Sequence, residues 1–271
     1  MKKANGTGPV YFFSKSISPI AEISPDCKIA IFLDFDGTLV PIQKDPARCV
    51  LSRETKEQLR SLGNSSRHFV TVLSGRALSD IKEKAGIRDI CYGGNHGLVI
   101  SGKGMRFIHP EAARALPVID KAARTLNKEI ASFAGVWIEN KKYSLSLHYR
   151  LADGGSIPRI KKIFRRVAEE FSWDRSITVM SGKKVLELIP NISWDKGHAA
   201  LWILSKLQSG YLPIFIGDDV TDETAFKAFE NRGITVRIGR SKMSLARYYL
   251  KNYRETRRLL EDIGTVYPIV A

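Results

Sequence analysis

Residues Ile29–Ile42 read IAIFLDFDGTLVPI, and this stretch decides the fold. Its first five residues are all apolar, which is typical of a strand covered on both faces of a parallel sheet. Asp34 interrupts the run where such a strand ends, and Asp36 follows with Gly37. An Asp-Gly pair is a hairpin-turn signal, which accounts for Asp36 but not for Asp34. Because open parallel sheets bind ligands at the carboxyl ends of their strands, we expect a functional site here.

Working outward, three further apolar runs predict strands of the same sheet. They are HFVTVLS at 68–74, LPIFIG at 212–217 and GITVRIG at 233–239. Helical segments lie between them, such as SRETKEQLRSLG at 52–63 and DETAFKAFENRG at 222–233. This alternation predicts an α/β fold with a doubly wound, Rossmann-like parallel sheet.

The middle of the chain has a different pattern. Residues 110–135 and 157–172 predict helices, whereas 135–150 and 176–190 each alternate as a strand does. Helices combined with antiparallel strands indicate a small α+β unit inserted into the larger fold. The predicted domains are therefore a core of residues 26–109 and 190–271, a cap of residues 110–189, and an N-terminal lead of residues 1–25 that is either disordered or packed on the core.

Composition narrows the class of protein. The chain has 271 residues, 44% of them hydrophobic and 26% charged, as expected of a folded protein with one large or two smaller domains. No apolar run approaches the roughly 20 residues of a membrane span, and the N-terminus lacks a signal-peptide pattern. We therefore expect a cytoplasmic protein without membrane contact. The formal charge of +15 invites a nucleic-acid partner, but the basic residues are scattered without a binding motif, so solvent-exposed helix faces explain them better.

The polar residues at the strand ends indicate phosphoryl transfer. A carboxylate can attack phosphorus and form an aspartyl-phosphate, and such a site needs Mg²⁺, further donors and an acid or base. Ser74 in TVLSGR follows a strand, and Lys196 in SWDKG precedes a helix. GDDVTDE ends a third strand in four acidic residues, Asp218, Asp219, Asp222 and Glu223. Each motif is weak alone, but their order and placement make the set specific.

These motifs resemble those of a known group of phosphatases. DFDGT, SGR, DKG and GDDVTDE are similar to the four motifs of the haloacid dehalogenase superfamily. YGGNHGLVI, WIENKKYSLSLHYR, KVLELIP and the tail SLARYYLKNYRETRRLLEDI resemble the trehalose-6-phosphate phosphatase family within it, over about residues 29–263. The resemblance implies a Mg²⁺-dependent phosphatase that releases trehalose and phosphate as the final step of trehalose biosynthesis, with a functional link to the synthase.

The resemblance also assigns roles in the core. Asp34 would be the nucleophile, Asp36 the general acid and base, and Lys196 the cation that holds Asp34 and the phosphoryl group. Thr38 and Ser74 would bind phosphoryl oxygens.

The metal ligands would be Asp34, the backbone carbonyl of Asp36, and Asp218. Asp219 and Asp222 would orient them, although Asp222 could instead be an acid favoured by a helix dipole.

In the cap, the resemblance implies substrate contacts from Lys141, His148, Lys183 and Glu187. Regular alternation through 137–150 places Lys141 and His148 on opposite faces, so either a bulge intervenes or one assignment is wrong. Glu187 could also be a cross-strand charge partner, and His148 a structural histidine. Arg76 is expected to brace the core through an ion pair.

Three alternatives stay open. Related capped phosphatases act on sucrose 6-phosphate or glycosyl-phosphoglycerates, and a phosphomutase uses the same two aspartates. The chain could also be a non-catalytic module that senses a sugar phosphate.

Overall fold

The computed structural model describes residues 8–14, 19–20, 23–24, 26–43, 48–173, 175–182 and 184–265. The chain divides into two compact units. One contains the described residues up to Arg106 and those from Trp194 onward, and we call it the core unit. The other, Phe107–Ser193, is the inserted unit. Within the described ranges, no helix is both long enough and apolar enough to cross a membrane.

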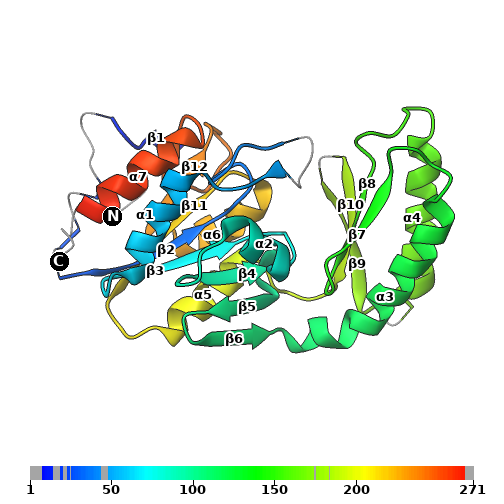
Figure 1. Cartoon of the computed structure of the whole chain (residues 1–271), viewed down its shortest axis with the longest axis horizontal. Helices are drawn as coiled ribbons and strands as arrows, with labels where there is room; N and C mark the ends of the chain where they lie inside the picture. The colour runs from blue at the N-terminus through cyan, green and yellow to red at the C-terminus, as the bar shows by residue number, and fades with distance from the viewer. Residues whose placement is uncertain are drawn as a thin grey trace. The chain divides into compact units, whose positions relative to one another are not determined.

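A nine-stranded sheet forms the centre of the core unit (Figure 1). Its strands, in spatial order, are β1 (Val10–Tyr11), β13 (Tyr248–Leu250), β12 (Ile234–Ile238), β11 (Tyr211–Gly217), β2 (Lys28–Leu33), β3 (His68–Leu73), β4 (Cys91–Gly94), β5 (Val99–Gly102) and β6 (Met105–Ile108). The pairs from β1 to β4 are parallel, and β5 runs antiparallel to β4. All four predicted strands are present, and the α/β fold class is confirmed.

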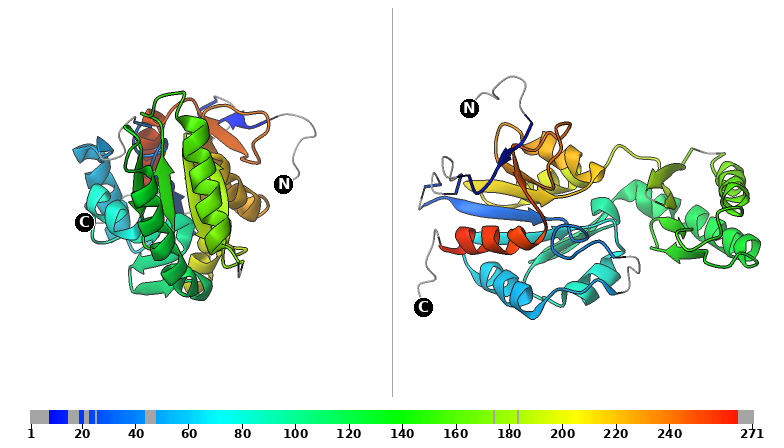
Figure 2. Two further views of the ribbon diagram at one scale, coloured as in Figure 1. Left: turned by 90° about the vertical axis from the view of Figure 1, so that its right-hand side faces the viewer. Right: turned by 90° about the horizontal axis from the view of Figure 1, so that it is seen from above.

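Helices cover both faces of this sheet, which explains why its central strands are apolar throughout. Ile29, Ile31 and Leu33 of β2 belong to the same apolar cluster as residues of three helices, α1 (Arg53–Asn64), α2 (Leu78–Ala85) and α7 (Arg254–Thr265). On the other face, the Phe32 ring lies 5.5 Å from that of Phe229 in α6 (Glu223–Phe229). Figure 2 shows the sheet between these two layers.

The parallel register brings the strand ends together. Leu33 of β2 pairs with Ile216 of β11 on one side and with Val72 of β3 on the other. The residues that follow these strands therefore leave the sheet at the same edge. Helix α5 (Lys196–Lys206) contacts α6 and also begins with a residue of the predicted site.

The described part of the predicted lead packs on the core unit. Strand β1 pairs with β13, and Phe12 is buried with its ring 5.5 Å from that of Tyr248. The other parts of residues 1–25, namely 1–7, 15–18, 21–22 and 25, lie outside the described residues.

The inserted unit is a four-stranded antiparallel sheet with helices on one face (Figure 1). Its strands, in spatial order, are β7 (Trp137–Asn140), β8 (Leu145–His148), β10 (Val185–Pro190) and β9 (Ile177–Gly182), and its helices are α3 (Pro110–Ile130) and α4 (Ile157–Phe171). Leu145, Leu147, Leu186 and Leu188 form one buried cluster with residues of both helices.

The expectation of one regular strand through 135–150 is wrong. The chain turns between β7 and β8, where Lys141 N donates to Ser144 O at 2.9 Å and Lys142 has a φ of 71°. The turn places Lys141 outside both strands, so strand alternation does not relate it to His148. The conflict between their faces therefore disappears without a bulge.

Removing a central aromatic side chain tests the packing of the core unit. Phe215 is fully buried, and its ring lies 5.8 Å from that of Phe226. Phe215→Ala should lower the free energy of unfolding by about 3–5 kcal/mol, because it leaves a cavity, as measured by urea denaturation. Met243→Ala, at a site 90% exposed, is the control and should change it by less than about 0.5 kcal/mol. Equal effects of the two substitutions would contradict this packing.

Candidate active site

The buried ammonium of Lys196 lies at the centre of the site. Its Nζ donates to Asp34 Oδ1 and to Asp222 Oδ1, both at 2.7 Å. Lys196 is the first residue of α5, and the preceding Asp195 caps this helix by accepting from His198 N. Although burial lowers the pKa of an ammonium, the two carboxylates raise the pKa of Lys196 above its ordinary value. The group therefore stays charged and binds Asp34 to Asp222.

Asp222 uses both of its carboxylate oxygens within the protein. While Oδ1 accepts from Lys196, Oδ2 accepts from the backbone N–H groups of Asp218 and Asp219, each at 2.9 Å. Asp222 is fully buried at the end of the 3₁₀ turn Val220–Asp222. Gly217 permits this approach, since a Cβ there would lie 2.4 Å from Asp222 Cγ. The contact with Asp219 N closes a capping box at the start of this turn, so Asp222 is a helix-terminal acid, and its contacts with Lys196 and Asp218 N are compatible with the predicted orienting role as well.

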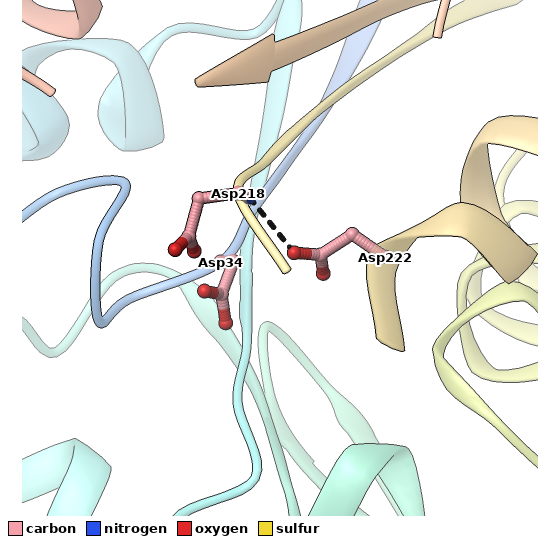
Figure 3. Close-up of side chains that lie close together, drawn as sticks. All are labelled: Asp34, Asp218 and Asp222. Atoms are coloured by element: carbon pink, nitrogen blue, oxygen red, sulfur yellow. Dashed lines mark hydrogen bonds between the residues drawn. The ribbon is translucent and has the colours of Figure 1, made fainter. Parts of the chain in front are cut away.

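Three aspartate side chains lie close enough together to hold a metal ion (Figure 3). Asp34, Asp218 and Asp222 each offer a carboxylate oxygen, and these oxygens lie within 4.8 Å of one another. Three ionised carboxylates against the Lys196 ammonium leave a formal charge of −2, which a divalent cation would balance. Oxygen ligands of this kind suit hard cations such as Mg²⁺. The donor set therefore fits a divalent metal.

The pKa shifts reflect the same crowding of negative charge. Burial raises the pKa of Asp34 well above its ordinary value, and Asp222 and Asp218 add to this effect while Lys196 opposes it. Burial and the neighbouring Asp222 raise the pKa of Asp218 to about 6. A cation bound between these groups would favour their charged forms and lower both pKa values.

Asp36 is held by Arg76 from the end of β3. Arg76 Nε donates to Asp36 Oδ2 at 2.6 Å, and Nη2 donates to Oδ1 at 2.7 Å. The third arm of the guanidinium, Nη1, donates to Asp80 Oδ2 at 2.8 Å. The predicted ion pair of Arg76 is confirmed, and its two-pronged geometry fixes the plane of the Asp36 carboxylate.

The predicted phosphate ligands lie at the same edge. Thr38 is buried, and its Oγ1 donates to Asp218 Oδ1 at 3.4 Å. Ser74, directly after β3, is also buried and accepts through Oγ from Arg76 N at 3.2 Å. The turn that carries Thr38 depends on Gly37, which has a φ of 90°, and a Cβ there would lie 2.1 Å from Asp218 Oδ2.

In the inserted unit, two of the predicted substrate residues contact each other. Lys141 Nζ donates to Glu187 Oε1 at 2.8 Å, and Ser146 Oγ donates to the same oxygen at 2.5 Å. Both charged residues are buried. The sequence reasoning missed Ser146, which the register of β8 and β10 places directly opposite Glu187. Lys183 lies outside the described residues.

His148 lies further along the same sheet. Its Nε2 is 2.8 Å from Glu139 Oε2, and its ring stacks on Trp137 with 4.7 Å between centroids and 11° between planes. Trp137 was also missed from sequence, because a single large apolar residue in a strand gives no signal of its own.

Comparison with solved structures assigns the fold to a class. A haloacid dehalogenase-like hydrolase from Bacteroides thetaiotaomicron matches with a TM-score of 0.59 and 17% identity, covering 89% of this chain and all of that one. The crystal structure of a trehalose-6-phosphate phosphatase related protein matches with a TM-score of 0.77 and 25% identity, covering 88% of this chain and 97% of that one. The fold is that of the haloacid dehalogenase-like hydrolases.

Comparison of sequences gives the family. Residues 32–253 match the family model described as trehalose-phosphatase. The chain belongs to the trehalose-phosphatase family. This result confirms the resemblance found in the sequence. It also identifies the chain as a phosphatase.

Named relatives agree with this family. Trehalose 6-phosphate phosphatase RA3 of Zea mays is 34% identical over 267 residues, which cover 91% of this chain and 72% of the maize protein. Trehalose-phosphate phosphatase of Mycobacterium tuberculosis H37Rv is 35% identical over 212 residues, covering 76% of this chain and 53% of that protein. The match therefore spans about half the length of the mycobacterial relative.

A glycine substitution tests the geometry at the carboxyl edge. Gly37→Ala should lower kcat/KM for an aryl phosphate by about 100-fold or more, because the new Cβ must displace the Asp218 carboxylate. Gly104→Ala is the matched control, since Gly104 has a φ of 77° but nothing within 4 Å of an added Cβ. Both variants should lose about 1–2 kcal/mol of stability from backbone strain, and only Gly37→Ala should lose activity. If both retain activity, Asp218 is not held as described.

Proposed function

We propose that this protein hydrolyses trehalose 6-phosphate to trehalose and phosphate through an aspartyl-phosphate on Asp34, a step of trehalose biosynthesis. The observation that carries the proposal is the buried Lys196–Asp34 ion pair beside Asp218 and Asp222. A fixed carboxylate next to a cation supports the role of nucleophile for Asp34, in a chain of the trehalose-phosphatase family. The substrate itself is supported by the names of the curated relatives.

In the first half of the reaction, an oxygen of Asp34 attacks phosphorus and the bond to the sugar oxygen breaks. Asp36 gives its proton to the departing sugar oxygen. Lys196 holds Asp34 in place and, with the Thr38 and Ser74 hydroxyls, favours the charge that develops on the phosphoryl oxygens. This requires the nucleophile to be ionised. Burial raises the pKa of Asp34, and the ammonium on Asp34 Oδ1 opposes that effect.

In the second half, water attacks the phosphorus of the aspartyl-phosphate. Asp36 takes a proton from this water, phosphate leaves, and the Asp34 carboxylate is restored. In the structure, Arg76 donates to both oxygens of the Asp36 carboxylate. The first half needs protonated Asp36, so in this mechanism Asp36 gives up at least one Arg76 contact when substrate binds.

Mg²⁺ is the proposed metal. Asp34, the backbone carbonyl of Asp36, and Asp218 would hold it, and Asp222 would position Asp218 through the backbone of the loop. When bound, the ion supplies positive charge that neutralises the phosphoryl oxygens and the acidic cluster.

The inserted unit is proposed to recognise the sugar. Lys141 and Glu187 provide buried, charged hydrogen-bonding groups of opposite sign, and Ser146 orients the glutamate. Such groups suit hydroxyls, because a carboxylate accepts and an ammonium donates. Lys183 was predicted to join them, and this stays a prediction. The link to the synthase also stays a prediction.

The other candidate functions are weaker. A purely regulatory module that senses a sugar phosphate has no need of Asp34 held by a buried ammonium, or of Asp36 fixed in one plane by Arg76. Activity on sucrose 6-phosphate or a glycosyl-phosphoglycerate would use the same core residues and differ in the inserted unit. The substrate panel below separates these possibilities.

Phosphate release from a panel of substrates tests the function. The panel contains trehalose 6-phosphate, sucrose 6-phosphate, glucose 6-phosphate, a glycosyl-phosphoglycerate and an aryl phosphate, each with Mg²⁺. We expect the highest kcat/KM for trehalose 6-phosphate, and loss of turnover by at least about 10⁴-fold in Asp34→Asn, which removes the nucleophile. Asp89→Asn, at an exposed position, is the control and should retain activity. Equal turnover of all the sugar phosphates would refute the substrate, and no turnover at all would favour the regulatory module.

Titration calorimetry with Mg²⁺ tests the metal site independently of turnover. Asp218→Asn should weaken Mg²⁺ binding roughly tenfold or more, because it removes a charged ligand. Asp89→Asn, at an exposed position of the core unit, serves as control. The Mg²⁺ affinity of this control variant should stay within about threefold of that of the unmodified protein, as expected for a residue that neither binds the metal nor contacts a ligand of it. Identical affinities in all three proteins would place the metal elsewhere.

A further inference from the structure

The sheet of the inserted unit has two chemically different faces. Leu145, Leu147, Leu186 and Leu188 point to one face and pack with α3 and α4. Because residues directly opposite one another in a sheet share a face, the register identifies the members of the second face. Trp137 pairs with His148, Glu139 with Ser146, and Ser146 with Glu187. The same rule also puts Val185, opposite His148, and Met180, opposite Glu187, on this face. We call the first five residues, which lie on the face away from α3 and α4, the polar face.

Trp137 is the large apolar residue on the polar face. Its side chain remains 37% exposed even though His148 stacks on it. A strand that only needed to build the unit's own core would place such a residue on the opposite face, toward the helices. Trp137 is thus a partly exposed aromatic surface on the face that α3 and α4 do not cover, and this points to a ligand.

The indole ring is held in a defined orientation. The His148 ring lies parallel to it, 4.7 Å away, and Glu139 fixes His148 through Nε2 at 2.8 Å. Both contacts join β7 to β8, whose register sets the pair side by side. A ring that is fixed before a ligand arrives loses little conformational entropy on binding.

The neighbours of Trp137 define the chemistry of the ligand. One residue pair along the same face lies Ser146, which donates to Glu187 together with Lys141. An aromatic surface beside a few fixed polar groups is the composition of a small-molecule site. A sugar ring matches both parts, since its C–H face packs on an indole and its hydroxyls bond to the carboxylate and the ammonium.

We propose that Trp137 is a specificity-determining residue that packs against a sugar ring of the substrate, and that His148 is a positioning residue that acts through Trp137. This inference rests on the proposed function, because it takes the ring from a sugar phosphate. It assigns His148 a different role from the direct substrate contact predicted from sequence, since Nε2 and one ring face already have partners.

Kinetics with two substrates test the role of Trp137. Trp137→Ala should lower kcat/KM for trehalose 6-phosphate on the order of tenfold, as for loss of a well-packed aromatic contact. The kcat/KM for an aryl phosphate should stay within about twofold of that of the unmodified protein. Trp137→Phe should recover most of the loss. Trp173→Ala is the matched control, removing a tryptophan of the same unit that is 81% exposed, and it should leave both substrates unchanged. Equal losses on the two substrates, or no loss on either, would overturn the proposal.

A double-mutant cycle tests the role of His148. His148→Ala alone should lower kcat/KM for trehalose 6-phosphate roughly threefold and leave kcat/KM for the aryl phosphate unchanged. In a Trp137→Ala background it should cause no further loss, because its effect passes through the indole. Full additivity of the two losses would overturn the positioning role and show that His148 contacts the substrate directly.

Binding without turnover gives a further readout. In Asp34→Asn, trehalose 6-phosphate should change the tryptophan fluorescence, and adding Trp137→Phe should remove most of that change. An unchanged signal after this substitution would overturn the proposal.

Failure of the proposed function is recognised separately, in the unmodified protein. If that protein prefers another sugar phosphate, the proposed substrate is wrong, and the same variants are compared on the preferred one. If it prefers trehalose 6-phosphate but Trp137→Ala affects both substrates alike, only the present inference is wrong.

Discussion

One buried ammonium organises the core unit. Lys196 contacts Asp34, which follows β2, and Asp222, which fixes the loop after β11. Removing this cation would leave two buried carboxylates without their positive counter-charge, a change that typically costs 3–5 kcal/mol. The contact therefore joins three separate parts of the chain at one point.

The contacts of Lys196 also explain why the site needs a bound cation. Lys196 balances only part of the charge on Asp34, Asp218 and Asp222, and burial raises the pKa values of Asp34 and Asp218. The apolar strands that carry these residues are stable because helices cover both of their faces. The polar residues lie at the strand ends, where a divalent cation can balance their negative charge.

The sequence was sufficient for the parts that depend on periodicity and on motif order. The apolar runs gave the four central strands, and the residues at their ends gave Asp34, Ser74 and Asp218 at a common edge. It was insufficient where contacts depend on register. The alternation through 135–150 hid a turn, because Lys142 adopts a positive φ without glycine. Ser146 and Trp137 could be recognised as candidate site residues only from the register, which places them opposite Glu187 and His148. The contacts of Lys183 stay a prediction.

The one-sided packing of the inserted sheet has an evolutionary consequence. Its helices bind only the leucine-rich face, so the folding energy of this unit resides largely in residues that no ligand needs to touch. Residues such as Trp137 and Glu139 can then be exchanged at a modest cost to stability. Under the proposed function, a lineage could therefore change the preferred sugar through a few substitutions on the polar face, while the residues proposed for phosphoryl transfer stay the same.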